Sequence, residues 1–212
     1  VDFIFDNDYA FLDRFDPTTE GYFNGNGEVT GRFFMTTDFV PDTRTIGLAD
    51  YSERGKGSTN MKFDLAKNTM CAHISEFPVG TYKKGHKHGP GAHVIILSGQ
   101  GYSILWPEGQ PMQRVNWKPG SVVVPPDQWF HQHLNSDAKP ARYLALRWGS
   151  WRFRFMRMQD GEGATYTSVK QGGGQIEFED EDPQIHRDFE AAMVKVGARC
   201  NMGAYHPGCT YK

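Results

Sequence analysis

Residues 80–99 read GTYKKGHKHGPGAHVIILSG, and residues 120–135 read GSVVVPPDQWFHQHLN. The first stretch holds two histidines, His86 and His88, separated by one residue. Alternate side chains of a β-strand point to the same face, so these two imidazoles can bind one ion. Imidazole is the commonest protein ligand for several transition metals. The pattern therefore indicates a metal site carried on extended chain.

The sequence around these two stretches has the patterns of short β-strands. Aromatic residues make up 14% of the chain and glycine is abundant at 24 residues, which suits pleated strands joined by tight turns. Apolar and polar residues alternate, or apolar residues cluster, between Gly and Pro turn signals. We expect strands at 61–65, 70–77, 94–97, 101–106, 121–124, 142–148 and 151–156. Seven or eight such strands predict an all-β barrel or jelly roll.

Two spaced sets of residues resemble the paired motifs of the cupin superfamily. They are Gly80, His86, His88 and Gly99 in the first motif, and Gly120, Pro126, His131 and Asn135 in the second. Gln128 stands where the second motif has a glycine. The resemblance covers about residues 60–150. It implies a cupin β-barrel (a double-stranded β-helix or jelly roll) that holds one divalent metal ion on His86, His88 and His131.

The chain departs from the first cupin motif at its glutamate. Counting six residues back from Gly99 places Ala92 there, whereas counting four forward from His88 places His93 there. One residue of shift moves a side chain to the other face of a strand, so the two counts predict different sites. Ala92 would leave an open three-histidine site, and His93 would add a fourth nitrogen ligand.

A three-histidine site resembles those of gentisate, salicylate and diketone-cleaving dioxygenases, which are ferrous cupins. The segment 86–96 looks like the gentisate dioxygenase form, in which a small residue replaces the glutamate. The resemblance implies an Fe(II) dioxygenase that cleaves a small anionic aromatic or enolic substrate with dioxygen. Mn, Zn, Ni and Co are alternative metals. Two other functions remain open: a non-oxidative isomerase, decarboxylase or lyase, and a metal- or ligand-binding cupin without turnover.

Further side chains are candidates for substrate binding and catalysis. His133 follows His131 by two residues, so we expect it beside the metal as a supporting or acid–base group, or else as a structural histidine. Arg147 ends an apolar strand and is a candidate to bind a substrate carboxylate, unless it is exposed or ion-paired. Tyr102, Trp106 and Trp129 flank the motifs and either line an aromatic pocket, with Tyr102 a catalytic candidate, or pack in the core.

Basic residues surround the two histidines of the first motif. Lys83, Lys84 and Lys87 favour an anionic substrate if they face the site, but an exposed basic turn is the simpler expectation. His186 and His206 lie far along the chain, and we expect them to face solvent.

The chain divides into three parts without an internal repeat. We expect an N-terminal arm at 1–58, the cupin barrel at 59–158, and a loop, helix and tail packed on the barrel at 159–212. Asp182 followed by proline predicts the helix start, and Gly197 predicts its end. The arm packs on the barrel or on a second subunit, and cupins commonly dimerise, so we expect a homodimer.

Composition excludes several partners. Lys and Arg total 23 against 25 Asp and Glu, and the net charge of −2 gives no field to attract nucleic acid or an anionic membrane. No apolar run is long enough to cross a bilayer. The three cysteines, Cys71, Cys200 and Cys209, have no zinc-type spacing and form no disulfide framework. We therefore expect a cytoplasmic protein.

Overall fold

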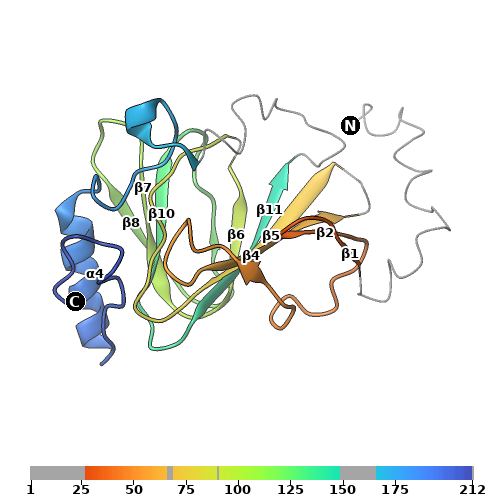
Figure 1. Cartoon of the computed structure of the whole chain (residues 1–212), viewed down its shortest axis with the longest axis horizontal. Coiled ribbons are helices and arrows are strands. Elements are labelled where there is room, and N and C mark those ends of the chain that lie inside the picture. The colour runs from red at the N-terminus through yellow and green to blue at the C-terminus, as the bar shows by residue number, and fades with distance from the viewer. Residues whose placement is uncertain (1–26, 66–68, 90, 149–165, 212) are drawn as a thin grey trace.

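The computed structural model describes residues 27–65, 69–89, 91–148 and 166–211, which form two β-sheets and a C-terminal helix (Figure 1). The elements in chain order are β1 (Glu28–Val29), β2 (Phe34–Thr37), β3 (Ala49–Asp50), β4 (Thr59–Leu65), β5 (Met70–Phe77), β6 (His93–Ser98), β7 (Gly101–Trp106), β8 (Gln113–Trp117), β9 (Val122–Val123), β10 (Phe130–Asn135), β11 (Ala141–Trp148), a 3-10 turn at Val169–Gln171, and α4 (Pro183–Lys195). The predicted all-β class is confirmed.

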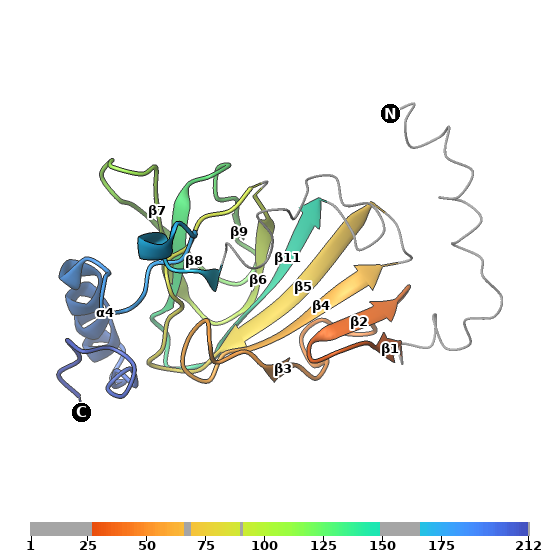
Figure 2. The same cartoon turned by 45° about the horizontal axis from the view of Figure 1, so that its top comes forward.

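The larger sheet has the order β1-β2-β4-β5-β11-β6-β9, with β3 paired to β4, and the smaller sheet has the order β10-β7-β8. All strand pairs are antiparallel except β2 with β4. Figure 2 shows the two sheets facing one another. Within the described ranges the two sheets share no strand pair, so the hydrogen bonding is that of facing sheets rather than of a closed barrel.

Each sheet buries one face against the other. The core between them joins Val94, Ile96 and Tyr143 of the larger sheet to Leu105 and Trp117 of the smaller one. Side chains alternate along a strand, so the residues between these face outward on both sheets. The outward face of β4 and β5 forms a second core with the segment between β2 and β3. The larger sheet therefore has an apolar core on each of its two faces.

The segment predicted as an arm extends the larger sheet. Within 27–58 it supplies β1, β2 and β3, and β4 begins at Thr59. Residues 1–26 lie outside the described residues, as do the strand expected at 151–156 and the expected boundary at 158. The expected strand ranges omit the two-residue strands β1 and β3, and also β8 and β10. Of these, β8 has the sequence QRVNW, and four of its five residues are exposed.

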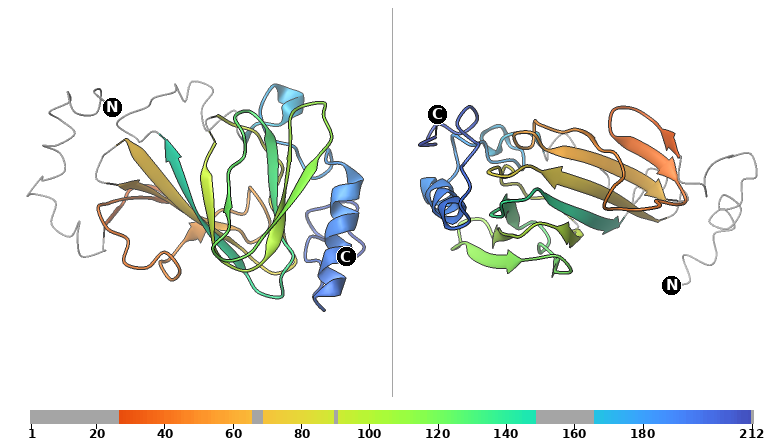
Figure 3. Two further views of the ribbon diagram at one scale, coloured as in Figure 1. Left: turned by 180° about the vertical axis from the view of Figure 1, so that it is seen from behind. Right: turned by 90° about the horizontal axis from the view of Figure 1, so that it is seen from below.

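The C-terminal helix forms where the sequence predicts it. The Asp182 carboxylate accepts from the Gln184 backbone N–H at 2.8 Å, and Gly197 has φ +69° just beyond the end. Ile185, Phe189 and Met193 are buried against the outward face of the smaller sheet (Figure 3). In the part of the chain that the structure describes, no helix is both long and apolar enough to span a membrane.

The motif glycines adopt a backbone conformation that other residues avoid. Gly99 and Gly120 have φ values of +77° and +85°. Gln128, in the place of the second motif's missing glycine, has φ +59° and is the single non-glycine residue with positive φ among the described residues. The motif turn is therefore preserved at Gln128, with a side chain in a strained region.

Candidate metal centre

Three histidines converge at one end of the space between the sheets. His86 pairs with His131 of β10 in an isolated antiparallel bridge, and His88 lies two residues further on the same side. Their ring centroids are 4.3 Å apart for His86 and His131, 4.9 Å for His88 and His131, and 5.5 Å for His86 and His88. One nitrogen from each ring lies within 4.8 Å of the others, so the three imidazoles can hold a divalent metal.

Backbone carbonyls orient two of these rings. His86 Nδ1 lies 3.1 Å from the Lys84 carbonyl, and His131 Nδ1 lies 3.1 Å from the Trp129 carbonyl. A carbonyl only accepts, so each Nδ1 carries the proton and each Nε2 keeps its lone pair for a metal. The chain thus fixes both tautomers before a metal binds.

Burial keeps the imidazoles of His86 and His131 neutral. It lowers the pKa of His131 to about 4, and together with the nearby Arg54 guanidinium it holds the pKa of His86 well below its usual range. Because a metal binds only the neutral imidazole, protons do not compete for these ligands near neutral pH.

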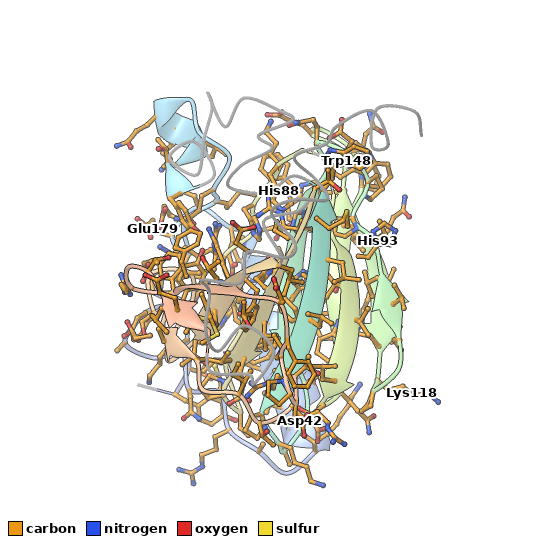
Figure 4. The ribbon with its side chains drawn as sticks, turned by 90° about the vertical axis from the view of Figure 1, so that its right-hand side faces the viewer. Asp42, His88, His93, Lys118, Trp148 and Glu179 are labelled. Atoms are coloured by element: carbon orange, nitrogen blue, oxygen red, sulfur yellow. The ribbon has the colours of Figure 1, made fainter. Side chains whose placement is uncertain are left out.

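Ala92, and not His93, stands where the cupin glutamate is expected. Ala92 is buried in the same core cluster as Val94 and Ile96, so it continues the inner face of β6. His93 is exposed and pairs with Leu146, which itself packs against the outward core. Figure 4 shows His93 at the outer side of the ribbon, apart from His88. The proposal of His93 as a fourth ligand is therefore wrong, because strand alternation turns it away.

His133 lies on the inner face of β10, beside the three histidines. Its ring centroid is 5.7 Å from that of His131 and 5.5 Å from that of Tyr143. Its Nδ1 lies 2.7 Å from Ser103 Oγ, which also accepts from Trp117 Nε1 at 3.0 Å. The indole can only donate, so the Ser103 hydroxyl proton is available to His133 Nδ1. This favours the His133 tautomer with its proton on Nε2.

Lys83 is buried rather than part of an exposed basic turn. It is 2% exposed, and its backbone N–H donates to the His133 carbonyl at 3.2 Å. Its ammonium donates to Ser75 Oγ and, at 3.1 Å, to Tyr143 Oη. Burial lowers the pKa of Lys83. Lys84 forms an ion pair with Glu177, and Lys87 forms one with Glu108. Both lysine side chains are partly buried, at 18% and 25% exposed, so the expectation of an exposed basic turn is wrong.

Two arginines add positive charge near the histidines. Arg147 lies on the same face of β11 as Tyr143 and Ala145, opposite Cys71, so it faces inward. Arg54 was not a candidate from sequence because it lies in the presumed arm. It is buried, donates to Gln175 Oε1 at 2.9 Å, and lies over the Tyr166 ring at 4.6 Å.

Several expected positions are wrong. Tyr102 is on the outward face of β7, buried in the core beneath α4, with the Arg114 guanidinium 3.6 Å from its ring centroid, so it cannot act at the metal centre. Trp106 packs against the same outward core, whereas Trp129 packs on the inner one. His186 and His206 are 1% and 5% exposed, not solvent-facing.

Comparison with known proteins finds solved structures that resemble about half of this chain. No family model matches the chain, and no curated protein matches it. Among solved structures, a mutant of oxalate decarboxylase from Bacillus subtilis is 18% identical over 47% of this chain and 27% of its own, with a TM-score of 0.40. A second variant of that enzyme is 14% identical over 48% of this chain and 28% of its own, with a TM-score of 0.43. A third structure of the same enzyme, which concerns its Mn(II) centres, is 18% identical over 47% of this chain and 27% of its own, with a TM-score of 0.40. The matched part thus spans about a quarter of the decarboxylase chain.

Proposed function

We propose that this chain is a metal-dependent cupin enzyme, an Fe(II) dioxygenase that cleaves a carbon–carbon bond of a small anionic aromatic or enolic substrate. The proposal is carried by the convergence of His86, His88 and His131, together with an alanine, Ala92, on the inner face where the motif has a glutamate. Three neutral imidazoles leave the charge of a bound divalent ion uncompensated, and they leave open positions for ligands. When bound there, Fe(II) supplies the one-electron chemistry that a reaction with dioxygen needs.

The chain's own contribution is to attract and orient an anion. Lys83 is buried beside Tyr143, and its ammonium contacts two hydroxyls and, among the described residues, no carboxylate. Arg54 and Arg147 add charge close enough to the histidines to lower the pKa of His131. In a site removed from water these charges interact strongly with a carboxylate or enolate. Arginine also offers the planar fork that matches a carboxylate.

His133 supports a second candidate, a non-oxidative isomerase, decarboxylase or lyase. Burial holds the pKa of His133 well below its usual range, so its imidazole is neutral. With the Ser103 hydroxyl at Nδ1, its Nε2–H can donate a hydrogen bond to an enolate oxygen and stabilise the negative charge there. The same group serves either reaction class, so the role of dioxygen distinguishes them.

Oxygen consumption tests the proposal. Fe(II)-loaded protein is incubated with a panel of salicylates, catechols and β-diketones, in air and under argon, and both substrate and dissolved oxygen are followed. We expect substrate loss in air with an equal uptake of oxygen, and none under argon. Loss under argon would establish the non-oxidative reaction instead. No loss in either atmosphere would contradict the dioxygenase. So would protein purified without iron whose zinc or nickel is lost on His131→Ala, because that metal would then belong to His86, His88 and His131.

The charge argument has its own test at Ala92. Ala92→Glu restores a carboxylate beside the metal, and Ala92→Gln is a control of equal size without charge. We expect the Glu variant to keep its metal and to bind salicylate at least about tenfold more weakly than the Gln variant, which corresponds to about 1.4 kcal/mol. Equal affinities of the two variants would mean that side-chain volume, and not charge, matters at this position.

A further inference from the structure

A second group of metal-binding side chains lies behind the smaller sheet. His186 and Glu190 are one turn apart on α4, and Cys200 and Cys209 are in the tail that follows it. Residues four apart on a helix project from the same face, which directs the imidazole and the carboxylate to one point. One ligand atom from each of the four residues lies within 4.8 Å of the others.

The distances among these atoms resemble the edges of a tetrahedral zinc site. His186 Nε2 lies 3.2 Å from Glu190 Oε1 and 4.0 Å from Cys200 Sγ, and the two Sγ atoms are 3.4 Å apart. With Zn–S bonds of about 2.3 Å and Zn–N or Zn–O bonds of about 2.0–2.1 Å, the edges of a tetrahedron are about 3.3–3.8 Å. Shifts of a few tenths of an ångström would complete the geometry.

The surroundings hold His186 and Glu190 as ligands. The Tyr82 hydroxyl lies 2.8 Å from His186 Nδ1 and donates to Glu181 Oε1 at 2.5 Å. Since the tyrosine proton goes to the carboxylate, its oxygen accepts from Nδ1–H, which leaves Nε2 with its lone pair toward the cysteines. Glu190 Oε1 accepts from the Thr210 backbone N–H at 2.8 Å and from its hydroxyl at 2.9 Å.

A neighbouring triad of Glu181, His186 and His206 shares one histidine with this group. Its other members already have hydrogen bonds: Glu181 Oε2 accepts from Gln132 at 3.0 Å, and His206 Nδ1 accepts from the Gly208 N–H at 3.0 Å. It also lacks thiolates, which select zinc over the hard cations. The four-residue group is therefore the better metal site.

We propose that His186, Glu190, Cys200 and Cys209 form a closed structural zinc site. His186, Cys200 and Cys209 are buried, and four protein ligands fill a tetrahedron without an open position. The ion fastens the tail to α4, where residues 198–211 form neither helix nor strand. Its ligand His186 is linked through Tyr82 to the core of the smaller sheet, on the side away from the first metal centre. This site does not depend on the proposed function.

Metal content and cobalt spectroscopy test the site. Protein purified under reducing conditions without added metal is assayed for zinc, in parallel with Cys209→Ser and with Cys71→Ser. Cys71 is the matched control, because it lies on β5 outside the cluster. We expect one zinc per chain in the parent and in Cys71→Ser, and at least a tenfold loss in Cys209→Ser. His86→Ala should keep this zinc while losing the metal of the first centre.

Cobalt reports the ligands without a substitution that endangers folding. Replacing zinc by Co(II) in the parent and in Cys71→Ser should give a thiolate-to-cobalt charge-transfer band together with the visible bands of tetrahedral cobalt. A parent chain that contains no zinc and shows no such band on cobalt addition would overturn the proposal. So would an intact mass two hydrogens below that of the reduced chain, because a Cys200–Cys209 disulfide would then occupy the site.

Discussion

His86 and His131 exchange two backbone hydrogen bonds: His86 N–H donates to the His131 carbonyl at 3.0 Å, and His131 N–H donates to the His86 carbonyl at 2.8 Å. Directly opposed residues of an antiparallel pair point to the same face. The separation of the two imidazoles is therefore set by backbone pairing, not by flexible side chains. His88 reaches the same side because the strand period is two.

This arrangement predicts which histidines carry the metal. Replacing His86, His88 or His131 with Ala should lower bound metal at least about tenfold, since each change removes one of three ligands and no carboxylate of the described residues joins this cluster to replace it. His93→Ala is the matched control and should keep full metal content, because His93 is exposed. The measurement is metal per chain after dialysis against weak chelator. Metal retained in His131→Ala, or lost in His93→Ala, would contradict the ligand assignment.

Replacing Lys83 should weaken ligand binding without lowering the stability of the fold. A buried ammonium that contacts only two hydroxyls among the described residues costs desolvation energy, so Lys83→Met should leave the free energy of unfolding unchanged or raise it. The same change should weaken salicylate binding about tenfold while metal content stays constant. Urea denaturation and titration calorimetry measure the two effects. Lys87→Met, which removes only a surface bridge to Glu108, should alter neither.

Spacing along the chain predicted that His86, His88 and His131 converge, because both motifs rely on a strand period that the sequence displays directly. It failed where the outcome depended on which face of a strand meets the other sheet. Tyr102 and Lys83 each lie next to correctly predicted residues, yet one faces outward and the other inward. For Tyr102 the face follows from the pairing of β7 with β10, and for Lys83 it follows from the bridge of Tyr82 to Leu134. Both pairings join residues far apart in sequence.

The buried histidines near the C-terminus were missed for a related reason. His186 precedes Glu190 by one turn and lies beside the apolar stripe of Ile185, Phe189 and Met193, a signal that the sequence does contain. His206 offers no such signal, because it lies in an irregular tail whose position depends on packing. The strand β8 was missed because only Trp117 of its five residues is buried.

At Gln128 we expect a glycine variant to be more stable than an alanine variant, which is the reverse of the usual order. At an ordinary exposed position Gly is less stable than Ala by about 0.5–1 kcal/mol, and the control Lys118→Gly against Lys118→Ala should show this. At Gln128, with φ +59°, Ala keeps the strain and Gly relieves it. Gln128→Gly should therefore be more stable than Gln128→Ala by about 1 kcal/mol. Chemical denaturation measures both pairs, and the same order at both positions would refute the strained turn.

Glu181 predicts a pH dependence with a definite sign. Burial raises the pKa of Glu181 from its usual 4.5 to about 7, while Tyr82 and Gln132 donate to the carboxyl group and limit the shift. The folded protein thus binds a proton that the unfolded chain releases between these two values. The resulting stability is full below pH 4.5 and is lost as the pH rises through about 7.

Glu181→Gln isolates that contribution, since the amide stays neutral at every pH. We expect the free energy of unfolding of the parent, relative to the variant, to fall by about 3 kcal/mol between pH 4.5 and pH 7.5, with the metal content of both held equal. Denaturation curves at a series of pH values measure the difference. Glu179→Gln is the control and should show no such slope, because Glu179 is exposed. A parent that instead gains stability relative to Glu181→Gln over this range would mean that Glu181 is charged in the folded protein, with His206 as the cation at 2.9 Å.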